Sequence, residues 1–334
     1  MTVRREPTLA DVAEVAGVSL TTVSRVLNNR GYLSQATKDR VAKAITQLNY
    51  RPNQVARALH GKSTKIIGVI VPTVALPFFG ELAAEIENAL ADHHYRMLVC
   101  NSMGRAERER EYLDLLISHR VDGIISGAHN ENLEEYQTVR MPLVTVDRDL
   151  SPTIPNIRCA NEAAAREATQ LLLDRGARRP ALLTSRTGTH NRREAGYRTV
   201  LADAGIEPLI FTVDFHTPDA ERARLIDAHL DAAADDIDAV FATDDLSAAA
   251  VLDWAERHGR RVPQDFKVIG FDGTSAVRRA LPGLATVRQP IAGIAAAAVD
   301  VLLAQIEAAA QGEEAAPVDS PIELPGELLV GTTA

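Results

Sequence analysis

The chain has 334 residues, which favours about two domains and is long enough to bury a sizeable core. Hydrophobic residues make up 46% and charged residues 24%, so a wholly disordered chain, a collagen and a coiled-coil rod are excluded. Two cysteines exclude a disulfide scaffold and a multi-cysteine zinc module. No apolar signal region opens the sequence, and Asp300 and Gln305 interrupt the apolar run from Ile291. A soluble cytoplasmic protein with no membrane contact is expected.

Charge is distributed unevenly along the chain, although the net charge is −9. Residues 1–62 hold ten Lys/Arg and four Asp/Glu, a net charge of +6. The remaining residues hold 26 basic and 41 acidic side chains, a net charge of −15. A small basic head on an acidic body suggests that the head meets a polyanion, although charge alone fits a solvated basic surface equally well.

The first 51 residues read as three short helices. Thr8 is placed to cap the first helix, and Gly17 to end it. Ser19 and Ser34 are placed to cap the second and third helices. The inward positions carry small or branched apolar side chains: Leu9, Val12, Ala13, Ala16, Val23, Val26, Leu27, Val41, Ala44, Ile45 and Leu48. Two helices joined by a tight glycine-containing turn predict a helix-turn-helix.

Residues 52–64 read as a hinge and linker. The segment 54–60 is compatible with a helix and ends at Gly61. It spans about two turns, and isolated helices this short are marginal in water. We therefore expect it to order only on a partner.

From Lys65 onward, short β-branched runs alternate with longer amphipathic runs. Strands are predicted at 66–71, 96–100, 123–126, 143–146, 181–184, 210–213, 239–243, 268–271 and 328–330. Helices are predicted at 79–92, 106–118, 162–175, 192–204, 218–232, 246–258 and 291–310. This alternation predicts an α/β body of two doubly wound lobes with parallel sheets.

Several motifs follow one another in a recognisable order: the head motif 8–28, then 48–53 and 56–59, then Ile67-Gly68-Val69-Ile70-Val71-Pro72, Val121-Asp122-Gly123-Ile124-Ile125, Ile269-Gly270-Phe271-Asp272 and Thr286-Val287-Arg288-Gln289-Pro290. Together these motifs resemble the lactose-repressor (LacI/GalR) family from about residue 8 to residue 330. The resemblance implies a DNA-binding headpiece at 1–51, a hinge helix at 52–64 and an effector-binding and dimerisation body at 65–334.

The resemblance also implies how the body is divided. It resembles a periplasmic sugar-binding protein whose two lobes are joined by three crossovers, near 160–163, 288–292 and 322–326. The N-lobe then takes about 65–160 plus 292–322, and the C-lobe about 163–288 plus 326–334. A small effector is expected between the lobes.

The second helix of a helix-turn-helix enters the major groove. Leu20, Thr21 and Arg25 fall at the family's base-reading positions, and an arginine is a natural bidentate reader of guanine. Four polar residues fall where backbone phosphates are held: Ser19, Thr22, Ser24 and Asn28. Three residues of the 52–64 segment match the family's DNA-contacting hinge positions: Asn53, Ala56 and Leu59. Leu59 matches the inserting leucine, and we expect it to kink the operator centre.

The expected effector residues lie where strands end. Asp147 and Asp272 follow two predicted strands, and the carboxyl ends of parallel strands face the ligand crevice. Arg193 opens a helix at the position of the family's effector-binding arginine, and such charged groups hold hydroxyls well. Three further candidates, Thr73, Phe78 and Phe215, line the same expected crevice, with Asp244 beside them.

The sequence departs from its sugar-binding relatives at Thr73, Leu76 and Thr243, where Asp or Asn is common. These departures leave monosaccharides in doubt, while disaccharides, nucleosides and other polar metabolites stay open. No metal set, cofactor motif or nucleophile constellation is found, so the chain is not expected to be an enzyme.

The leading interpretation is a repressor that binds palindromic operator DNA as a homodimer under the control of a sugar, a sugar derivative or a nucleoside. The alternative is a solute-binding receptor with the same body, against which the basic head and the missing signal sequence argue. Neither the effector's sign nor the regulated genes can be read from the chain.

Overall fold

The computed structural model describes residues 7–27, 31–50, 63–128, 130, 133–148, 150–151, 153–316, 318 and 321–334. Its contacts divide the chain into two compact units, Met1–Thr64 and Lys65–Ala334. We describe each unit by itself.

The first unit is a bundle of three helices, α1 (Leu9–Ala16), α2 (Leu20–Leu27) and α3 (Gln35–Leu48). Thr8 and Asp11 form a reciprocal capping box at α1, and Gly17 ends that helix in the left-handed conformation with a φ of 62°. Ser34 caps α3 through the Thr37 amide. The three predicted helices and their caps at Thr8 and Ser34 are confirmed.

The core of this small bundle is built from the predicted inward positions. Val12, Val23 and Val41 are fully buried, one from each helix. The other predicted apolar positions pack around them, together with Val18 of the turn and Tyr50. The bundle therefore fixes α2 by burying one face and leaves the other face of α2 outward.

The second unit contains two six-stranded sheets, and we name the lobe around each one. The N-lobe sheet has the order β11-β5-β4-β3-β1-β2, and the C-lobe sheet has the order β12-β10-β9-β8-β6-β7. The N-lobe strands are β1 (Ile66–Val71), β2 (Arg96–Asn101), β3 (Gly123–Ser126), β4 (Leu143–Val146), β5 (Asn156–Cys159) and β11 (Ile322–Leu324). The C-lobe strands are β6 (Pro180–Thr184), β7 (Leu209–Thr212), β8 (Ala239–Ala242), β9 (Lys267–Asp272), β10 (Ala285–Arg288) and β12 (Glu327–Leu329).

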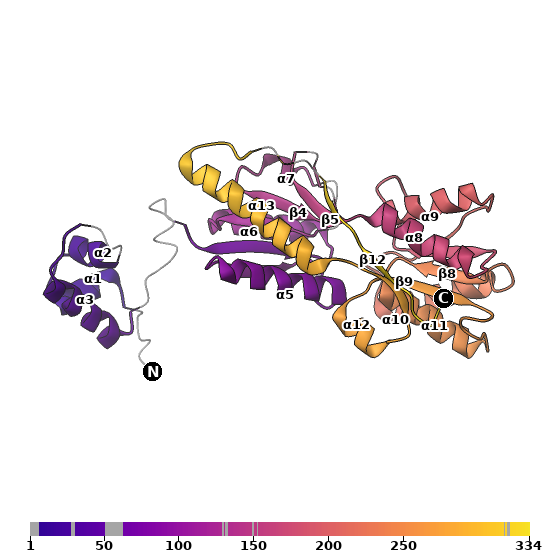
Figure 1. The fold of residues 1–334 in the computed structure, drawn as a ribbon. Coiled ribbons are helices and arrows are strands. Elements are labelled where there is room, and N and C mark those ends of the chain that lie inside the picture. The colour runs from indigo at the N-terminus through magenta and orange to yellow at the C-terminus, as the bar shows by residue number, and fades with distance from the viewer. Residues whose placement is uncertain are drawn as a thin grey trace. The chain divides into compact units, whose positions relative to one another are not determined.

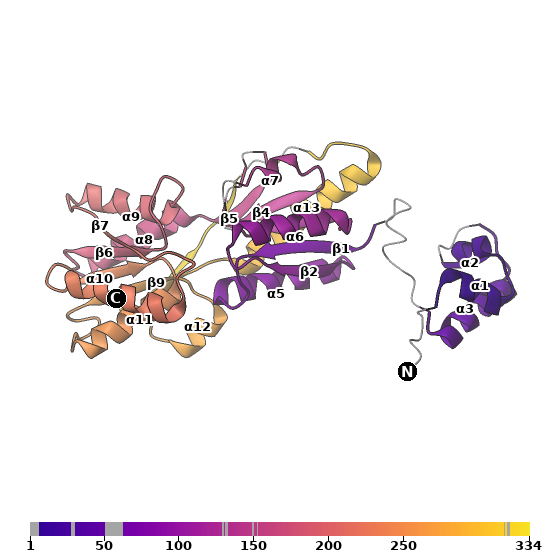
Figure 2. The same ribbon diagram turned by 180° about the vertical axis from the view of Figure 1, so that it is seen from behind.

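Helices cover both faces of each sheet (Figures 1 and 2). In the N-lobe, one face carries α5 (Pro77–Asp92) and α13 (Ile291–Gln311), and the other carries α6 (Ala106–Ser118) and α7 (Glu135–Thr138). In the C-lobe, one face carries α8 (Asn161–Asp174) and α9 (Arg192–Asp203), and the other carries α10 (Asp219–Ala232) and α11 (Asp245–Arg257). The short α12 (Ser275–Ala280) follows β9. The predicted two-lobed α/β architecture is confirmed.

The chain passes between the two sheets three times, between β5 and α8, between β10 and α13, and between β11 and β12. Among the described strands, every pair is parallel except β10 with β12, which is antiparallel. The exception has a simple cause. β10 leads the chain out of the C-lobe, whereas β12 leads it back in, so the two neighbours run in opposite directions.

By length and composition, α13 is the one helix in the described part of the chain that could cross a membrane. Its Ile294, Ala298 and Leu302 are instead buried in the N-lobe core, where the helix packs on α5 and the sheet. The Gln305 carboxamide also accepts a hydrogen bond from the Leu143 amide of β4. These contacts are those of a core helix.

Candidate functional site

The outward face of α2 carries the side chains that the sequence predicted to read bases. Leu20 is 51% exposed, and Thr21 and Arg25 are exposed as well. Val23, on the opposite face, is fully buried and anchors the helix in its bundle. An exposed guanidinium beside a threonine and a leucine offers a bidentate donor and an apolar contact, which suit a guanine edge and a thymine methyl group.

The predicted phosphate-contacting residues surround this face. Ser19 is exposed and accepts a hydrogen bond from the Thr22 amide at 3.1 Å, so it caps α2. Thr22 and Ser24 are half-buried. Four predicted DNA contacts lie outside the described residues: Asn28, Asn53, Ala56 and Leu59.

In the body, Asp147 and Asp272 directly end two strands in different lobes. Asp147 follows β4 of the N-lobe, and Asp272 is the last residue of β9 in the C-lobe. Both have a positive φ, 68° for Asp147 and 108° for Asp272. Aspartate adopts a positive φ more readily than most residues other than glycine.

Arg193, near the start of α9, is held by three different groups of the C-lobe. Its Nε donates to Asn161 Oδ1 at 2.8 Å, and its Nη1 donates to the Thr243 carbonyl at 2.5 Å. Its guanidinium carbon also lies 3.7 Å from the centre of the Phe271 ring, a cation–π contact. The guanidinium is therefore fixed in position, with only 17% of its side chain exposed.

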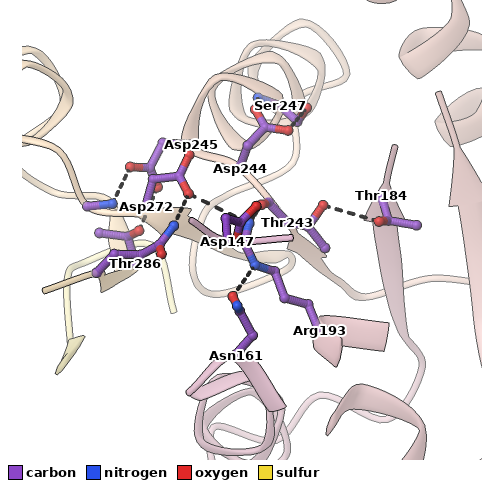
Figure 3. Close-up of polar contacts among 12 residues, drawn as sticks. Asp147, Asn161, Thr184, Arg193, Thr243, Asp244, Asp245, Ser247, Asp272 and Thr286 are labelled. Carbon is purple, nitrogen blue, oxygen red and sulfur yellow. Dashed lines mark hydrogen bonds and ion pairs between the residues drawn. The ribbon is translucent and has the colours of Figure 1, made fainter. Parts of the chain in front are cut away.

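The same guanidinium connects the two aspartates, as Figure 3 shows. Arg193 Nη1 lies 3.6 Å from Asp272 Oδ1, and Nη2 lies 4.0 Å from Asp147 Oδ1. Because Asp147 belongs to the N-lobe, the second pair joins the lobes. The three predicted charged residues are thus brought together, and the polar cluster that they form lies between the sheets.

Burial changes the acid chemistry of this cluster. It raises the pKa of Asp272 well above its ordinary value, while Arg193 acts in the opposite direction. Burial also raises the pKa of Asp245 to about 6, against hydrogen bonds from the Thr286 hydroxyl and the Gly273 amide. Gly270 leaves room for this carboxyl, since a Cβ there would lie 2.3 Å from Asp245 Oδ1.

An aromatic pair lies across the lobes, and it differs in one member from the predicted pair. The Phe79 ring of α5 meets the Phe215 ring edge-on, with centroids 6.4 Å apart. The predicted Phe78 is buried, and its ring packs edge-on against the Phe79 ring with centroids 5.1 Å apart. Adjacent helical residues point about 100° apart, and Phe79 is the one whose ring meets Phe215 at this distance. The role of Phe78 at the effector site stays a prediction.

The remaining predicted effector residues have other local partners. Both carboxylate oxygens of Asp244 accept hydrogen bonds from Ser247, each at 2.7 Å, so Asp244 caps α11. Thr73 is half-buried and accepts a hydrogen bond from the Ala75 amide at 3.2 Å. Either side chain would have to share or give up these bonds to hold a ligand.

Sequence reasoning also missed Asn161 and Gln289. The Gln289 carboxamide donates to Asp272 Oδ1 at 2.8 Å, and its backbone amide donates to the Asp272 carbonyl at 3.1 Å. Gln289 lies where the chain leaves the C-lobe, between β10 and α13. Its place in the Thr286–Pro290 motif was the available signal, whereas its partner became visible only in the fold. Among the described residues, no cluster of His, Cys, Asp and Glu could hold a metal ion.

Two family models match the chain. The model described as bacterial regulatory proteins, lacI family, matches residues 8–53, which include the helix-turn-helix. The model described as a periplasmic binding protein-like domain matches residues 144–333.

Similar proteins extend over nearly the whole chain. The sucrose operon repressor of Pediococcus pentosaceus is 40% identical over 98% of this chain and 100% of its own length. The ribose operon repressor of Halalkalibacterium halodurans is 36% identical over 90% of each chain. Among solved structures, a lac repressor dimer bound to operator and an anti-inducer superposes with a TM-score of 0.82, at 26% identity over 98% of this chain and 99% of the other.

Proposed function

The chain belongs to the LacI family of bacterial regulatory proteins and is a DNA-binding transcriptional repressor rather than an enzyme, and from this premise we propose that a sugar bound between its lobes controls its operator affinity. The observation that carries the proposal is the polar cluster of Arg193, Asp147 and Asp272. Both lobes contribute to it, so a ligand held there senses their relative arrangement.

The chemistry of the cluster suits a polyhydroxylated ligand. Carboxylates accept, and the guanidinium donates, charge-assisted hydrogen bonds to hydroxyl groups. Phe79 and Phe215 meet edge-on across the lobes, and aromatic rings together with a few polar groups are typical of small-molecule sites. The relatives named as sucrose and ribose operon repressors support a sugar rather than a nucleoside.

On the DNA side, we propose that Leu20, Thr21 and Arg25 read bases, with Ser19, Thr22, Ser24 and Asn28 on phosphates. The hinge residues Asn53, Ala56 and Leu59 are proposed to complete the contact. We propose that the chain is divided into a headpiece at 1–51, a hinge at 52–64 and a body at 65–334. We also propose that the protein is cytoplasmic.

A homodimer follows from the palindromic operator, since one helix-turn-helix reads only a half-site. The edge strand β2 supports a contact between copies. Its Leu98 and Val99 are 41% and 38% exposed, and exposed apolar edges are otherwise protected in natural sheets. Val99→Arg should therefore shift the light-scattering mass from dimer to monomer, whereas a monomeric wild-type chain that binds operator would contradict the assignment.

A thermal-shift screen of the full chain against sucrose, ribose, cellobiose and nucleosides tests the effector. Each sugar that raises the melting temperature is then added to an operator gel shift. We expect at least one sugar to change operator affinity, with release as the expected direction. If only nucleosides raise the melting temperature, a nucleoside replaces the sugar as the proposed effector.

A further inference from the structure

A hydrogen-bonded contact between the lobes lies outside the polar cluster and has no role in the function derived so far. It joins Glu81 of α5, in the N-lobe, to Ser275 of α12, which follows β9 of the C-lobe. Figures 1 and 2 both show α12 beside the start of α5, and the two helices are in contact. We call this contact the Glu81–Ser275 latch.

The latch uses both oxygens of one carboxylate. The Ser275 amide donates to Glu81 Oε2 at 2.7 Å, and the Ser275 hydroxyl donates to Oε1 at 3.1 Å. The first amides of a helix have no partner within it and need an acceptor from outside. The N-cap residue of α12, Thr274, makes no side-chain capping bond, and its hydroxyl is buried without a hydrogen-bond partner among the described residues. Glu81 therefore caps a helix of the opposite lobe.

Short segments connect the latch to both walls of the effector site. Ser275 is three residues after Asp272, and the loop between them is held by the Gly273 amide on Asp245 at 2.8 Å. The loop has little freedom, because a Cβ at Gly273 would lie 2.5 Å from Arg288 Cα. On the other side, Glu81 is two residues after Phe79 in the same helix. Movement of α12 away from α5 would thus displace Asp272 relative to Phe79.

We propose that Glu81 is a positioning residue of the effector site: by capping α12 from the opposite lobe, it favours the closed arrangement of the lobes and so sets the affinity for the sugar. The proposal rests on the proposed function, in which the effector binds between the lobes. Apparent affinity falls in proportion to the population of the binding-competent arrangement, so loss of the latch weakens binding without removing a ligand contact.

The first test is a double-mutant cycle on the full chain with sucrose, measured by calorimetry. Glu81→Ala removes both bonds and should raise the Kd about tenfold, whereas Ser275→Ala keeps the amide and should raise it about threefold. The double variant should bind like Glu81→Ala, because the two side chains act through one contact. Glu85→Ala, one turn along α5, makes the same charge change and should bind like wild type. Wild-type affinity in Glu81→Ala, or additive losses in the double variant, would overturn the proposal.

The second test needs no sugar and therefore separates the latch from the proposed function. In hydrogen exchange of the free protein, the α12 amides of Glu81→Ala should exchange about tenfold faster, with β1 unchanged. Glu81→Gln keeps one acceptor oxygen and should restore most of the protection and of the affinity. If wild type binds none of the screened sugars but the exchange result holds, the sugar assignment fails and the latch stands. Unchanged exchange in α12 overturns the latch whatever the sugar result.

Discussion

The headpiece and the effector site present their functional side chains in opposite ways. Leu20, Thr21 and Arg25 stand exposed on one helix face, whereas Asp147, Arg193 and Asp272 are mostly buried and already paired with one another. These three candidates for base reading therefore carry their side chains on the surface of the bundle. At the proposed effector site, by contrast, a hydroxyl-bearing ligand would replace or extend a network that joins the lobes. The contrast explains why the headpiece can act as a fixed reader and the body as a sensor.

The largest expected effect is on sugar binding by the body. Arg193→Ala should weaken sugar binding by about 100-fold or more, because charge-assisted bonds are lost and two buried carboxylates lose their shared cation. Titration calorimetry with the sugar identified by the screen measures the loss. Operator affinity without effector should stay within about twofold of wild type.

Arg192→Ala provides the matched control for this experiment. Arg192 is the neighbouring arginine on α9, but it lies 3.6 Å from Glu162 and is half exposed. It should bind sugar like wild type. Equal losses in the two variants would show that the effector site is not the one around Arg193.

The second effect is on operator binding by the headpiece. Arg25→Ala should cost about 1–3 kcal/mol on the cognate operator and relax the preference at one base pair per half-site. Lys43→Ala, an exposed cation on α3, should instead weaken cognate and random DNA alike. Gel shifts on both kinds of DNA separate the two behaviours. A uniform loss for Arg25→Ala would remove it from the base-reading set.

The smallest effect concerns the buried carboxyl beneath the sensor. Because the folded pKa of Asp245 is raised to about 6, its protonated form is favoured by folding. The stability that this proton contributes is present at low pH and is lost as the pH rises through about 6. The free energy of unfolding should therefore fall by about 1 kcal/mol between about pH 5 and pH 7 from this group.

Asp245→Asn should remove that slope, since a carboxamide can donate to the Thr286 hydroxyl and accept from the Gly273 amide. The single tryptophan, Trp254, is fully buried in the C-lobe core and reports unfolding of that lobe by fluorescence. Identical pH profiles for wild type and Asp245→Asn would contradict the assignment.

The sequence predicted elements well where the pattern is local. The apolar runs at Ile66–Val71 and Leu143–Val146 were placed with their observed ends, because both are fully apolar or β-branched. The strands β5, β10 and β11 were not predicted. They span three or four residues, and β5 and β11 contain Arg158 and Glu323, which look like loop residues until the fold pairs them at 2.9 Å.

The proposed effector site could likewise be predicted only in part from the sequence. The positions of Asp147 and Asp272 follow from strand ends, so a sequence argument reaches them. Asn161 and Asp245 matter because of partners far away in the chain, and no local pattern marks them. Gln289 lies in a recognised motif, but its bond to Asp272 became visible only in the fold. The contact of Phe79 with Phe215 likewise depends on the fold, and the sequence alone does not indicate it.

The three crossings between the lobes also govern the order in which a newly made chain can complete its parts. The headpiece bundle comes first in the chain, and its core is built from described residues up to Tyr50. The C-lobe sheet has all but its last strand by residue 288, whereas the N-lobe, although it begins at β1, lacks α13 and β11 until residue 324. Until then the core positions on β4 and α5 that pack against α13 have no cover. During synthesis the headpiece is therefore complete long before the N-lobe of the body. A chain truncated within α13 would retain the headpiece but lack a complete effector-binding body.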